Sequence, residues 1–473
     1  MDRLILTHES QSANLKGKGP AAHHGPFASH SEPPPVVPDS TRRAFFILLG
    51  LSLIATAFLF NTPKDVFAGS LKILLSPANL LTDYFELANI GATLLNAGLM
   101  TLVSICMVCL NQTPVTGSIA AAIFTVAGFS FFGKNLYNSI PIVLGVYLYS
   151  RLVRQPYNRF LIQSLFGTAL GPLVSLVTFA IGIRQPFGIL LGMGCGVLAG
   201  FLLPPLSAHF LRFHQGFNLY NIGFTTGIIA TIFIAVLRGF GIEVATVSIV
   251  STGNNKSLSI MLFSLFAAML LLGLAYNRMG LRGYRHLLNQ SGKLASDFTV
   301  IAGPGITLLN MSLLGILSTT YVLLLGGQIN GPIIGGIFTV VGFGAFGKHL
   351  RNVIPIFAGI LLANLFNIYD PHSTTGLVST LFGTTLAPIA GYYGAGYGIL
   401  AGFLHMALVT NISYLHGGIN LYNNGFSGGF VAAALVPVID MISQVLTERR
   451  QERAAAANRR PDQEKESQDR TKP

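Results

Sequence analysis

Charged residues are scarce in this chain of 473 residues, since only 10% of them are Asp, Glu, Lys or Arg. Soluble domains carry about 25% charged residues, so the deficit argues against a soluble globular protein. Hydrophobic residues make up 51% of the chain, and the mean hydropathy is +0.61. Apolar stretches close to the length of a membrane-spanning helix recur along most of the sequence. These features predict an all-α, polytopic membrane protein.

Acidic residues are nearly missing from the apolar stretches. All 17 lie in tails, loops or helix ends, and Asp440, near the C-terminal end of the last apolar segment, lies nearest to the membrane. Proton-coupled carriers usually place a carboxylate within the membrane, so proton coupling is disfavoured, whereas carbonyl and hydroxyl oxygens still allow a sodium site. The HExxH pattern and paired aspartates are also absent. We therefore do not expect an enzyme.

Tryptophan is absent and cysteine is rare, with Cys106, Cys109 and Cys195 all inside apolar stretches. The spacing of Cys106 and Cys109 fits half of a metal or redox motif, but no second ligand pair accompanies it. We interpret all three as small apolar helix residues and predict no metal and no cofactor. Without tryptophan, tyrosine is left as the interfacial aromatic residue.

The net charge of +12 is concentrated at the termini and in a few loops. Basic loops beside apolar spans are typical of cytoplasmic membrane faces, so nucleic acid is not an expected partner. We predict a disordered tail over residues 1–43 and a charged tail over residues 446–473. Both tails are expected in the cytoplasm of a cell whose plasma (inner) membrane holds the protein, with the loop around Lys64–Glu86 outside.

The chain contains an internal repeat. Gly117–Pro141 and Gly331–Pro355 align without a gap at an offset of 214 positions, and Lys134 recurs as Lys348. Two further blocks follow in the same order, Leu-Phe-Gly-Thr at 165–168 and 381–384, then Asn-Leu-Tyr-Asn at 218–221 and 420–423. Three collinear blocks indicate a duplication.

The duplication divides the chain into two membrane units, residues 44–240 and 257–445, with a linker over residues 241–256. Each unit contains seven apolar segments, of which the third and fifth are short or interrupted by Gly and Pro. The segments of the first unit are roughly 44–60, 89–110, 117–132, 137–150, 160–182, 186–206 and 217–240. Those of the second unit are roughly 257–275, 304–325, 331–346, 352–367, 375–393, 395–412 and 419–445.

An odd number of segments places the second unit upside down relative to the first. The distribution of Lys and Arg agrees, because residues 151–159 hold three arginines while their counterpart, residues 367–374, holds none. We therefore favour inverted repeats over parallel repeats. Inverted repeats with paired, broken segments are typical of carriers that bind a solute near the membrane midplane.

Polar side chains recur at matching positions of the two units. Each Asn-Leu-Tyr-Asn block opens an apolar helix, and the spacing of Asn218 and Asn221 predicts that they share a helix face. Such groups are costly in hydrocarbon unless they meet a partner or a cavity, so they either join the two units or line a solute path. The candidate substrate-binding residues are Asn218, Tyr220, Asn221, Asn420, Tyr422, Asn423, Lys134, Lys348, Thr168 and Thr384.

The two matched lysines, Lys134 and Lys348, follow the Gly-rich ends of the third segments. Inversion would place one near each membrane face, and a matched lysine at both mouths favours an anionic or polar solute. Snorkelling to lipid headgroups is the alternative interpretation.

The Phe-Thr-Val-x-Gly-Phe…Gly-Lys…Asn…Ile-Pro and Asn-Leu-Tyr-Asn-x-Gly-Phe blocks resemble an uncharacterised family of prokaryotic multi-pass membrane proteins, a domain of unknown function. The resemblance covers most of residues 44–445 and implies a bacterial-type plasma membrane protein without indicating a substrate. At fold level, seven-plus-seven inverted repeats are also similar to nucleobase and sulfate permeases, an analogy that no shared motif supports.

These observations predict membrane transport of a small polar or anionic solute by a secondary transporter or facilitator. The alternatives are a passive channel, which the missing carboxylates favour, and a non-transporting membrane scaffold. The expected partners are the lipid bilayer and a small-molecule solute, and a homo-oligomer is compatible with this interpretation. A hollow interface between the repeats would favour transport, whereas a dry interface would favour the scaffold.

Overall fold

The computed structural model describes residues 37–78, 81–244, 248–366 and 369–469, and for residues 454–469 only the backbone. The chain divides into a compact body, Pro34–Val436, and a second unit whose described part is helical from Pro437 onward. The body contains every candidate site residue named above.

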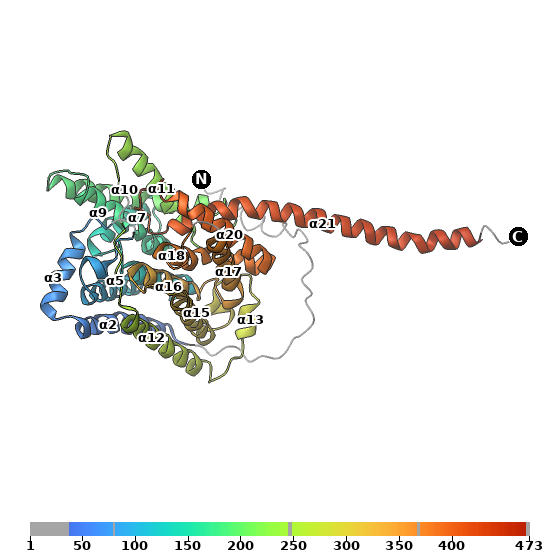
Figure 1. The fold of residues 1–473 in the computed structure, drawn as a ribbon, viewed down its shortest axis with the longest axis horizontal. Coiled ribbons are helices and arrows are strands. Elements are labelled where there is room, and N and C mark those ends of the chain that lie inside the picture. Colours follow the sequence, from blue (N-terminus) through green and yellow to red (C-terminus); the bar gives the residue numbers. More distant parts are fainter. Residues whose placement is uncertain (1–36, 79–80, 245–247, 367–368, 470–473) are drawn as a thin grey trace. The chain divides into compact units, whose positions relative to one another are not determined.

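The body is built of helices (Figure 1). Among the described residues, nine helical stretches are long and apolar enough to cross a bilayer, and three further apolar helices are shorter. A helix of about 20 apolar residues spans the hydrocarbon layer. The protein is therefore a multi-pass membrane protein.

The helices of the first copy follow the seven predicted apolar segments, with a few short helices between them. They are α2 (Asp39–Phe60), α3 (Pro63–Leu74), α4 (Tyr84–Leu87), α5 (Ile90–Leu110), α6 (Gly117–Phe129), α7 (Leu136–Leu152), η1 (Tyr157–Phe160), α8 (Leu161–Gly167), η2 (Thr168–Leu170), α9 (Gly171–Phe179), α10 (Phe187–Phe210) and α11 (Asn221–Gly239).

Among the described residues, the second copy repeats this order of elements except that η1 has no counterpart. Its helices are α12 (Asn255–Tyr276), α13 (Tyr284–Leu288), α14 (Phe298–Ile301), α15 (Pro304–Leu324), α16 (Gly331–Phe343), α17 (Leu350–Phe366), α18 (Thr374–Gly383), η3 (Thr384–Leu386), α19 (Ala387–Tyr393), α20 (Ala395–Ile412) and α21 (Asn423–Asp469).

The first long helix begins at Asp39 rather than at residue 44, so residues 39–43 are not part of a disordered tail. The carboxylate of Asp39 explains the earlier start, because it accepts a hydrogen bond from Val115 N (2.8 Å) and pairs with Arg43 Nε (2.6 Å). Residues 1–36 lie outside the described residues. At the other end, the predicted charged tail is helical as far as Asp469.

The fifth segment of each copy is broken at its centre. A 3-10 turn, Thr168–Leu170, separates α8 from α9 in the first copy, and Thr384–Leu386 separates α18 from α19 in the second. The predicted interruption of the fifth segments is therefore confirmed. Backbone groups freed by such a break need partners inside the protein, since lipid offers none.

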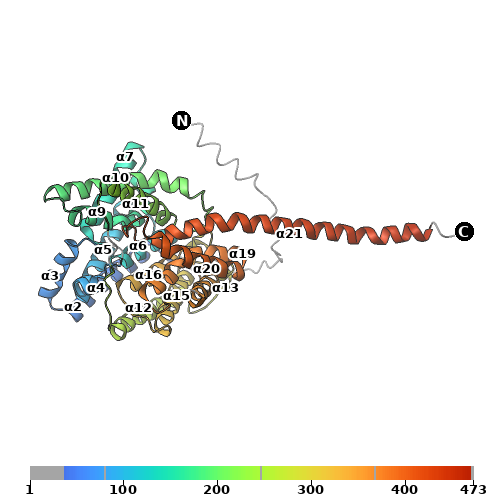
Figure 2. The same ribbon diagram turned by 45° about the horizontal axis from the view of Figure 1, so that its top comes forward.

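The helices of the two copies pack in a palindromic order. Contacts run from α2 to α5, α6, α16, α15 and finally α12, so each copy contributes the same three helices in opposite order (Figure 2). The same equivalence holds around this row, where α7 packs on α10 and α17 packs on α20. Equivalent helices of the two copies therefore occupy equivalent places in this row.

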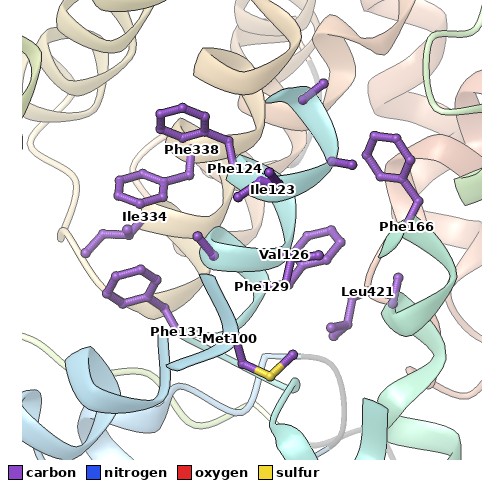
Figure 3. Close-up of a cluster of buried hydrophobic side chains, with 14 of the residues drawn as sticks. Met100, Ile123, Phe124, Val126, Phe129, Phe131, Phe166, Ile334, Phe338 and Leu421 are labelled. Atoms are coloured by element: carbon purple, nitrogen blue, oxygen red, sulfur yellow. The ribbon is translucent and has the colours of Figure 1, made fainter. Parts of the chain in front are cut away.

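The two central helices, α6 and α16, run antiparallel and touch through glycine. A Cβ placed on Gly128 would lie 2.9 Å from Gly335 O, and a Cβ on Gly335 would lie 3.0 Å from Gly128 O, so only glycine permits this approach. On the same interface the rings of Phe124 and Phe338 meet edge to face, with centroids 5.8 Å apart (Figure 3).

The outer helices, α2 and α12, present large apolar side chains outward. Leu48 and Leu59 of α2 are 65% and 84% exposed, and Ile260 and Leu271 of α12 are 60% and 62% exposed. A soluble protein would rarely expose such a row, whereas lipid tails solvate it well. The contrast with the buried α6 and α16 places the interface between the copies at the centre of the body.

Candidate functional site

An aspartate of the opposite copy caps each central helix. The N–H of Gly331, the first residue of α16, donates to Asp83 Oδ1 (3.2 Å), and the N–H of Gly117, the first residue of α6, donates to Asp297 Oδ2 (2.9 Å). A carboxylate at a helix N-terminus satisfies a free N–H group and interacts favourably with the helix dipole. We refer to these two contacts as the crossed caps.

Asp83 lies in the loop around Lys64–Glu86 and was expected to be accessible to solvent, which its burial contradicts. Its side chain is fully buried and also accepts hydrogen bonds from Phe85 N (2.9 Å), Ser251 N (2.9 Å) and Ser251 Oγ (2.7 Å). Burial raises the pKa of Asp83, while the bonds from Ser251, Phe85 and Gly331 act in the opposite direction. The carboxylate therefore belongs to the interface between the copies.

Two asparagines that the sequence analysis missed shape the turns after the central helices. Asn96 Nδ2 donates to Ser130 O (2.7 Å) and Lys134 O (2.9 Å). Asn310 Nδ2 donates in the same way to Gly344 O and Lys348 O, both at 2.8 Å. Both asparagines end a Thr-Leu-Leu-Asn sequence at the same offset of 214, so extending the repeat upstream would have found them.

The glycine before each lysine lets the chain turn back at the end of the central helix. Gly133 has a φ of 73° and Gly347 a φ of 103°, a region that disfavours residues with a Cβ. A further asparagine braces each turn from α7 or α17, since Asn138 Nδ2 donates to Gly133 O (3.0 Å) and Asn352 Nδ2 donates to Gly347 O (2.9 Å). The two lysine turns therefore share the glycine and the asparagine contacts, but Lys134 N donates to Phe132 O whereas Lys348 N donates to Phe343 O.

Lys348 uses this turn to reach partners from both copies. Its Nζ donates to Tyr220 Oη at 2.5 Å and to Thr384 Oγ1 at 2.6 Å. The amine also lies 4.5 Å from the centroid of the Tyr220 ring. The side chain has no exposed surface, so its polar group is satisfied entirely within the protein.

Lys134 occupies the equivalent position without the equivalent bonds. Its Nζ is fully buried, makes no hydrogen bond to any described residue, and lies 5.4 Å from the Phe129 ring centroid. The hydroxyl of Tyr422, the counterpart of Tyr220, is likewise buried and makes no hydrogen bond of normal geometry in the described part of the chain, although the hydroxyl of Thr125 lies beside it. The Tyr422 ring packs on the same Phe129, with centroids 4.7 Å apart.

The two lysines do not lie at the mouths of a path, contrary to the sequence-based expectation, and they do not snorkel to headgroups. Lys134 and Lys348 are both 0% exposed. The tyrosines associated with them meet at the centre of the interface, where the ring centroids of Tyr220 and Tyr422 are 5.2 Å apart. Four of the candidate residues, Lys348, Tyr220, Thr384 and Tyr422, thus gather in one cluster next to Lys134.

The first asparagine of each Asn-Leu-Tyr-Asn block joins the two copies. Asn218 Nδ2 donates to Gly425 O (2.9 Å), and its Oδ1 accepts from Thr385 Oγ1. Asn420 makes the reciprocal contact, a longer one of 3.4 Å, to Gly223 O. Both side chains are fully buried. The structural interpretation of these residues fits this geometry better than a path-lining role.

The blocks also supply the broken fifth segments with backbone partners. Leu219 N donates to Thr385 O (3.0 Å), and Leu421 N donates to Ala169 O (3.2 Å), each across to the other copy. The block is extended at this point, because α11 begins only at Asn221. The helix begins three residues after Asn218. Asn218 and Asn221 therefore do not share a helix face, and that prediction is wrong.

The second asparagine of each block lies apart from the lysine cluster. Asn221 Oδ1 pairs with His214 Nε2 (3.0 Å), and Asn423 Oδ1 pairs with His416 Nε2 (2.8 Å). Both amides also donate to the preceding long helix, Asn221 Nδ2 to Ser207 O (3.0 Å) and its counterpart in the same way. These contacts fix the start of α11 and α21.

Thr168 differs from its counterpart Thr384 in what it faces. Its Oγ1 donates to Leu165 O (2.6 Å), and the residue lines a cavity of about 110 Å³ between α5, α6, α7 and α8. The walls of this cavity are apolar apart from hydroxyls of Ser104, Ser139 and Thr168. Both threonines donate to the carbonyl three residues before them, but Thr384 also accepts a hydrogen bond from Lys348, whereas Lys134 donates none to Thr168.

Comparison with known families adds one match. The family model described as "Protein of unknown function (DUF1576)" matches residues 62–239 and 276–441. The chain belongs to the DUF1576 family. The two matched ranges of this DUF1576 protein begin 214 positions apart, the offset of the internal repeat. No curated protein and no solved structure matches the chain.

Proposed function

We propose that this DUF1576 protein is a secondary transporter or facilitator for a small anionic solute, which binds between Lys134 and Tyr422. The observation that supports this most is the pair of buried polar groups, Lys134 Nζ and Tyr422 Oη, that lack hydrogen bonds of normal geometry to described residues. A buried polar group without a partner costs about 1–3 kcal/mol. An oxyanion accepts hydrogen bonds from both an amine and a phenol, so its binding would remove that cost.

The equivalent site around Lys348 suggests how binding is coupled to movement. Lys348 is engaged by Tyr220 and Thr384, so in this arrangement it has no donor left facing an open space. We propose that a second arrangement exchanges the roles, with Lys134 held by Tyr422 and Thr168 while Lys348 is released. Two equivalent arrangements of one packed interface provide the bistability that alternating access requires.

The proposed membrane orientation is that of inverted repeats. The antiparallel α6 and α16, the odd number of apolar segments in each unit and the opposite bias of Lys and Arg in the loops support it. In this orientation both tails lie in the cytoplasm and the protein resides in the plasma membrane. The lysine cluster then lies near the bilayer midplane, where one site can serve both sides.

A non-transporting scaffold is the second candidate, and the dry packing around the asparagines favours it. Asn218, Tyr220 and Asn420 expose at most 2% of their surface, and the amides are engaged across the interface. A passive channel is the remaining alternative, and it would require a water-filled path through the body. The scaffold predicts that Lys134 has no ligand.

The experiment that tests the proposal compares Lys134→Met with the wild type in proteoliposomes. Uptake of labelled phosphate, sulfate and small carboxylates is measured, together with the melting temperature of the purified proteins in each anion. We expect the wild type to transport at least one anion and to be stabilised by it, and Lys134→Met to lose both responses. A wild type that neither transports nor is stabilised by any of them would favour the scaffold.

Asn218→Ala separates structural from solute-binding asparagines in the same assay. The substitution leaves Gly425 O and Thr385 Oγ1 without their partner, so we expect a loss of about 1–3 kcal/mol in stability. Because the amide is engaged by protein, the variant should keep its anion response at temperatures where it stays folded. If the Asn218→Ala variant were stable but no longer responded to anions, Asn218 would be a solute-binding residue.

A further inference from the structure

A polar cavity of about 360 Å³ lies in the second copy, next to the lysine turn. Its walls come from the end of α13 and the two residues after it (Leu288–Gln290), from His349 and Arg351 at the start of α17, and from the end of α19 and the start of α20 (Ala390–Ala395). Cavities of roughly 300–1,000 Å³ are typical of small-molecule sites. His349 directly follows Lys348 in the chain, so the cavity lies at the lysine turn of the second copy.

The positive charge of this cavity comes from Arg351, not from His349. His349 Nδ1 accepts a hydrogen bond from Asn352 N (3.3 Å), so its Nε2 carries the proton and donates to Gln290 O (2.9 Å). Burial lowers the pKa of His349 to about 4, which keeps the ring neutral at pH 7. Arg351 is exposed, and its Nη1 donates to Asn289 Oδ1 (2.6 Å).

Aromatic rings form one side of the cavity, and a lysine lies against them. The Nζ of Lys293 lies 4.2 Å from the Phe217 ring centroid and 5.7 Å from that of Tyr392, which lines the cavity. Lys293 thus adds to the positive potential around the cavity. The described lining residues include no acidic side chain.

The first copy has no such charge at the equivalent turn. Asn135 and Tyr137 stand where the second copy has His349 and Arg351. Asn135 Nδ2 donates to Ile73 O (3.1 Å), and Tyr137 Oη pairs with Thr178 Oγ1 (2.8 Å), so both side chains are engaged inside their own copy. The repeat therefore folds without an arginine at this position, and Arg351 is not required by the architecture.

We propose that the cavity around Arg351 binds an oxyanion and is the vestibule through which the solute reaches Lys348. The planar guanidinium keeps donors that Asn289 does not use, and its fork matches the two oxygens of a phosphate or carboxylate. The role as vestibule rests on the transport function proposed above. The oxyanion comes either from a soluble solute or from the headgroup of an anionic lipid.

The test measures binding of inorganic phosphate to the purified full-length protein by calorimetry, with Arg351→Gln as the variant. Arg212→Gln is the matched control, because Arg212 is an exposed arginine at the end of α10 in the other copy. We expect Arg351→Gln to weaken binding by about ten- to a hundredfold, the loss of one charged hydrogen-bond partner. Arg351→Lys should lie between this variant and the wild type, and Arg212→Gln should bind as the wild type does.

Nanodiscs of phosphatidylglycerol and phosphatidylcholine distinguish the two sources of the oxyanion. Competition between phosphatidylglycerol and free phosphate that depends on Arg351 would assign the cavity to a headgroup, and its absence would assign it to a soluble anion. Equal phosphate affinity in Arg351→Gln and the wild type, or an equal loss in Arg212→Gln, would overturn the proposal.

Different results would disprove the vestibule proposal and the transport proposal. Lys134→Met should still bind phosphate at the cavity, because Lys134 is not among its lining residues. If no anion is transported but Arg351-dependent binding persists, the cavity binds oxyanions, while the transport function and with it the vestibule role are wrong. If transport depends on Lys134 while Arg351→Gln binds and transports normally, the vestibule proposal alone is wrong.

Discussion

The turns that carry Lys134 and Lys348 share one backbone framework and differ in the state of the side chain. In each turn a glycine with positive φ precedes the lysine, and an asparagine of the preceding long helix holds the carbonyls. Only Lys348 completes the cluster with a tyrosine and a threonine. The comparison teaches that the scaffold around the amine is symmetric while the hydrogen bonding of the amine is not.

The largest effect is expected from removing the shared framework. Asn96→Ala and Asn310→Ala each leave two buried carbonyls without a donor, at about 1–3 kcal/mol per group. We expect both variants to lose stability to a similar extent, measured by thermal unfolding in detergent. A marked difference between the two would mean that the backbone framework is not equivalent, which would break the comparison.

The next effect should separate the two copies. Lys348→Met removes the donor to Tyr220 Oη and Thr384 Oγ1, and we expect a loss of about 1–3 kcal/mol and a lower melting temperature. Lys348→Arg is a useful companion, because it retains donors and should recover part of the loss if space permits. A Lys348→Met protein as stable as the wild type would show that these bonds contribute nothing.

The equivalent substitution in the first copy, Lys134→Met, is expected to raise the stability of the protein rather than lower it. Lys134→Met replaces an unpartnered buried amine by an apolar side chain of similar length, so stability should rise by about 1–2 kcal/mol. The measurement is the melting temperature without added anion, compared with that of Lys348→Met. A decrease in melting temperature would mean that Lys134 already has a stabilising partner in solution.

The smallest effect concerns the two phenols. Tyr220→Phe removes the acceptor of Lys348 and should cost about 1 kcal/mol. Tyr422→Phe deletes a hydroxyl that makes no hydrogen bond of normal geometry to the described residues, so it should be neutral within about 0.5 kcal/mol. Equal losses of stability for the two substitutions would mean that both phenols make equivalent hydrogen bonds. The two copies would then not differ in the hydrogen bonding of their lysines.

The pattern of apolar, Gly and Pro residues in the sequence was sufficient to predict the helical segments and their breaks. Hydropathy located the apolar segments, and the Gly and Pro residues near Thr168 and Thr384 marked the breaks that the structure contains. These features are local, since segment length and backbone flexibility depend on neighbouring residues. The duplication was equally accessible because identical residues recur at a constant offset.

The geometry of the site depended on contacts between distant segments. Asp83 and Asp297 looked like loop residues because nothing local reveals that each meets a helix of the other copy. The burial of Lys134 and Lys348 was missed for the same reason, since a lysine beside an apolar segment more often extends to the membrane surface. The upstream recurrence of Asn96 and Asn310 was present in the sequence and would have revealed the braced turns.

The crossed caps carry a consequence for the origin of the chain. In each copy, an aspartate caps the central helix of the other copy. The central helix of the same copy is capped in turn by the aspartate of the other copy. Two identical single-copy ancestors would have completed each other by the same exchange, as an isologous dimer does. Joining them in one polypeptide fixed the stoichiometry and made the partner permanent. From that point the two lysine turns were free to diverge, because a substitution in one no longer appeared in the other.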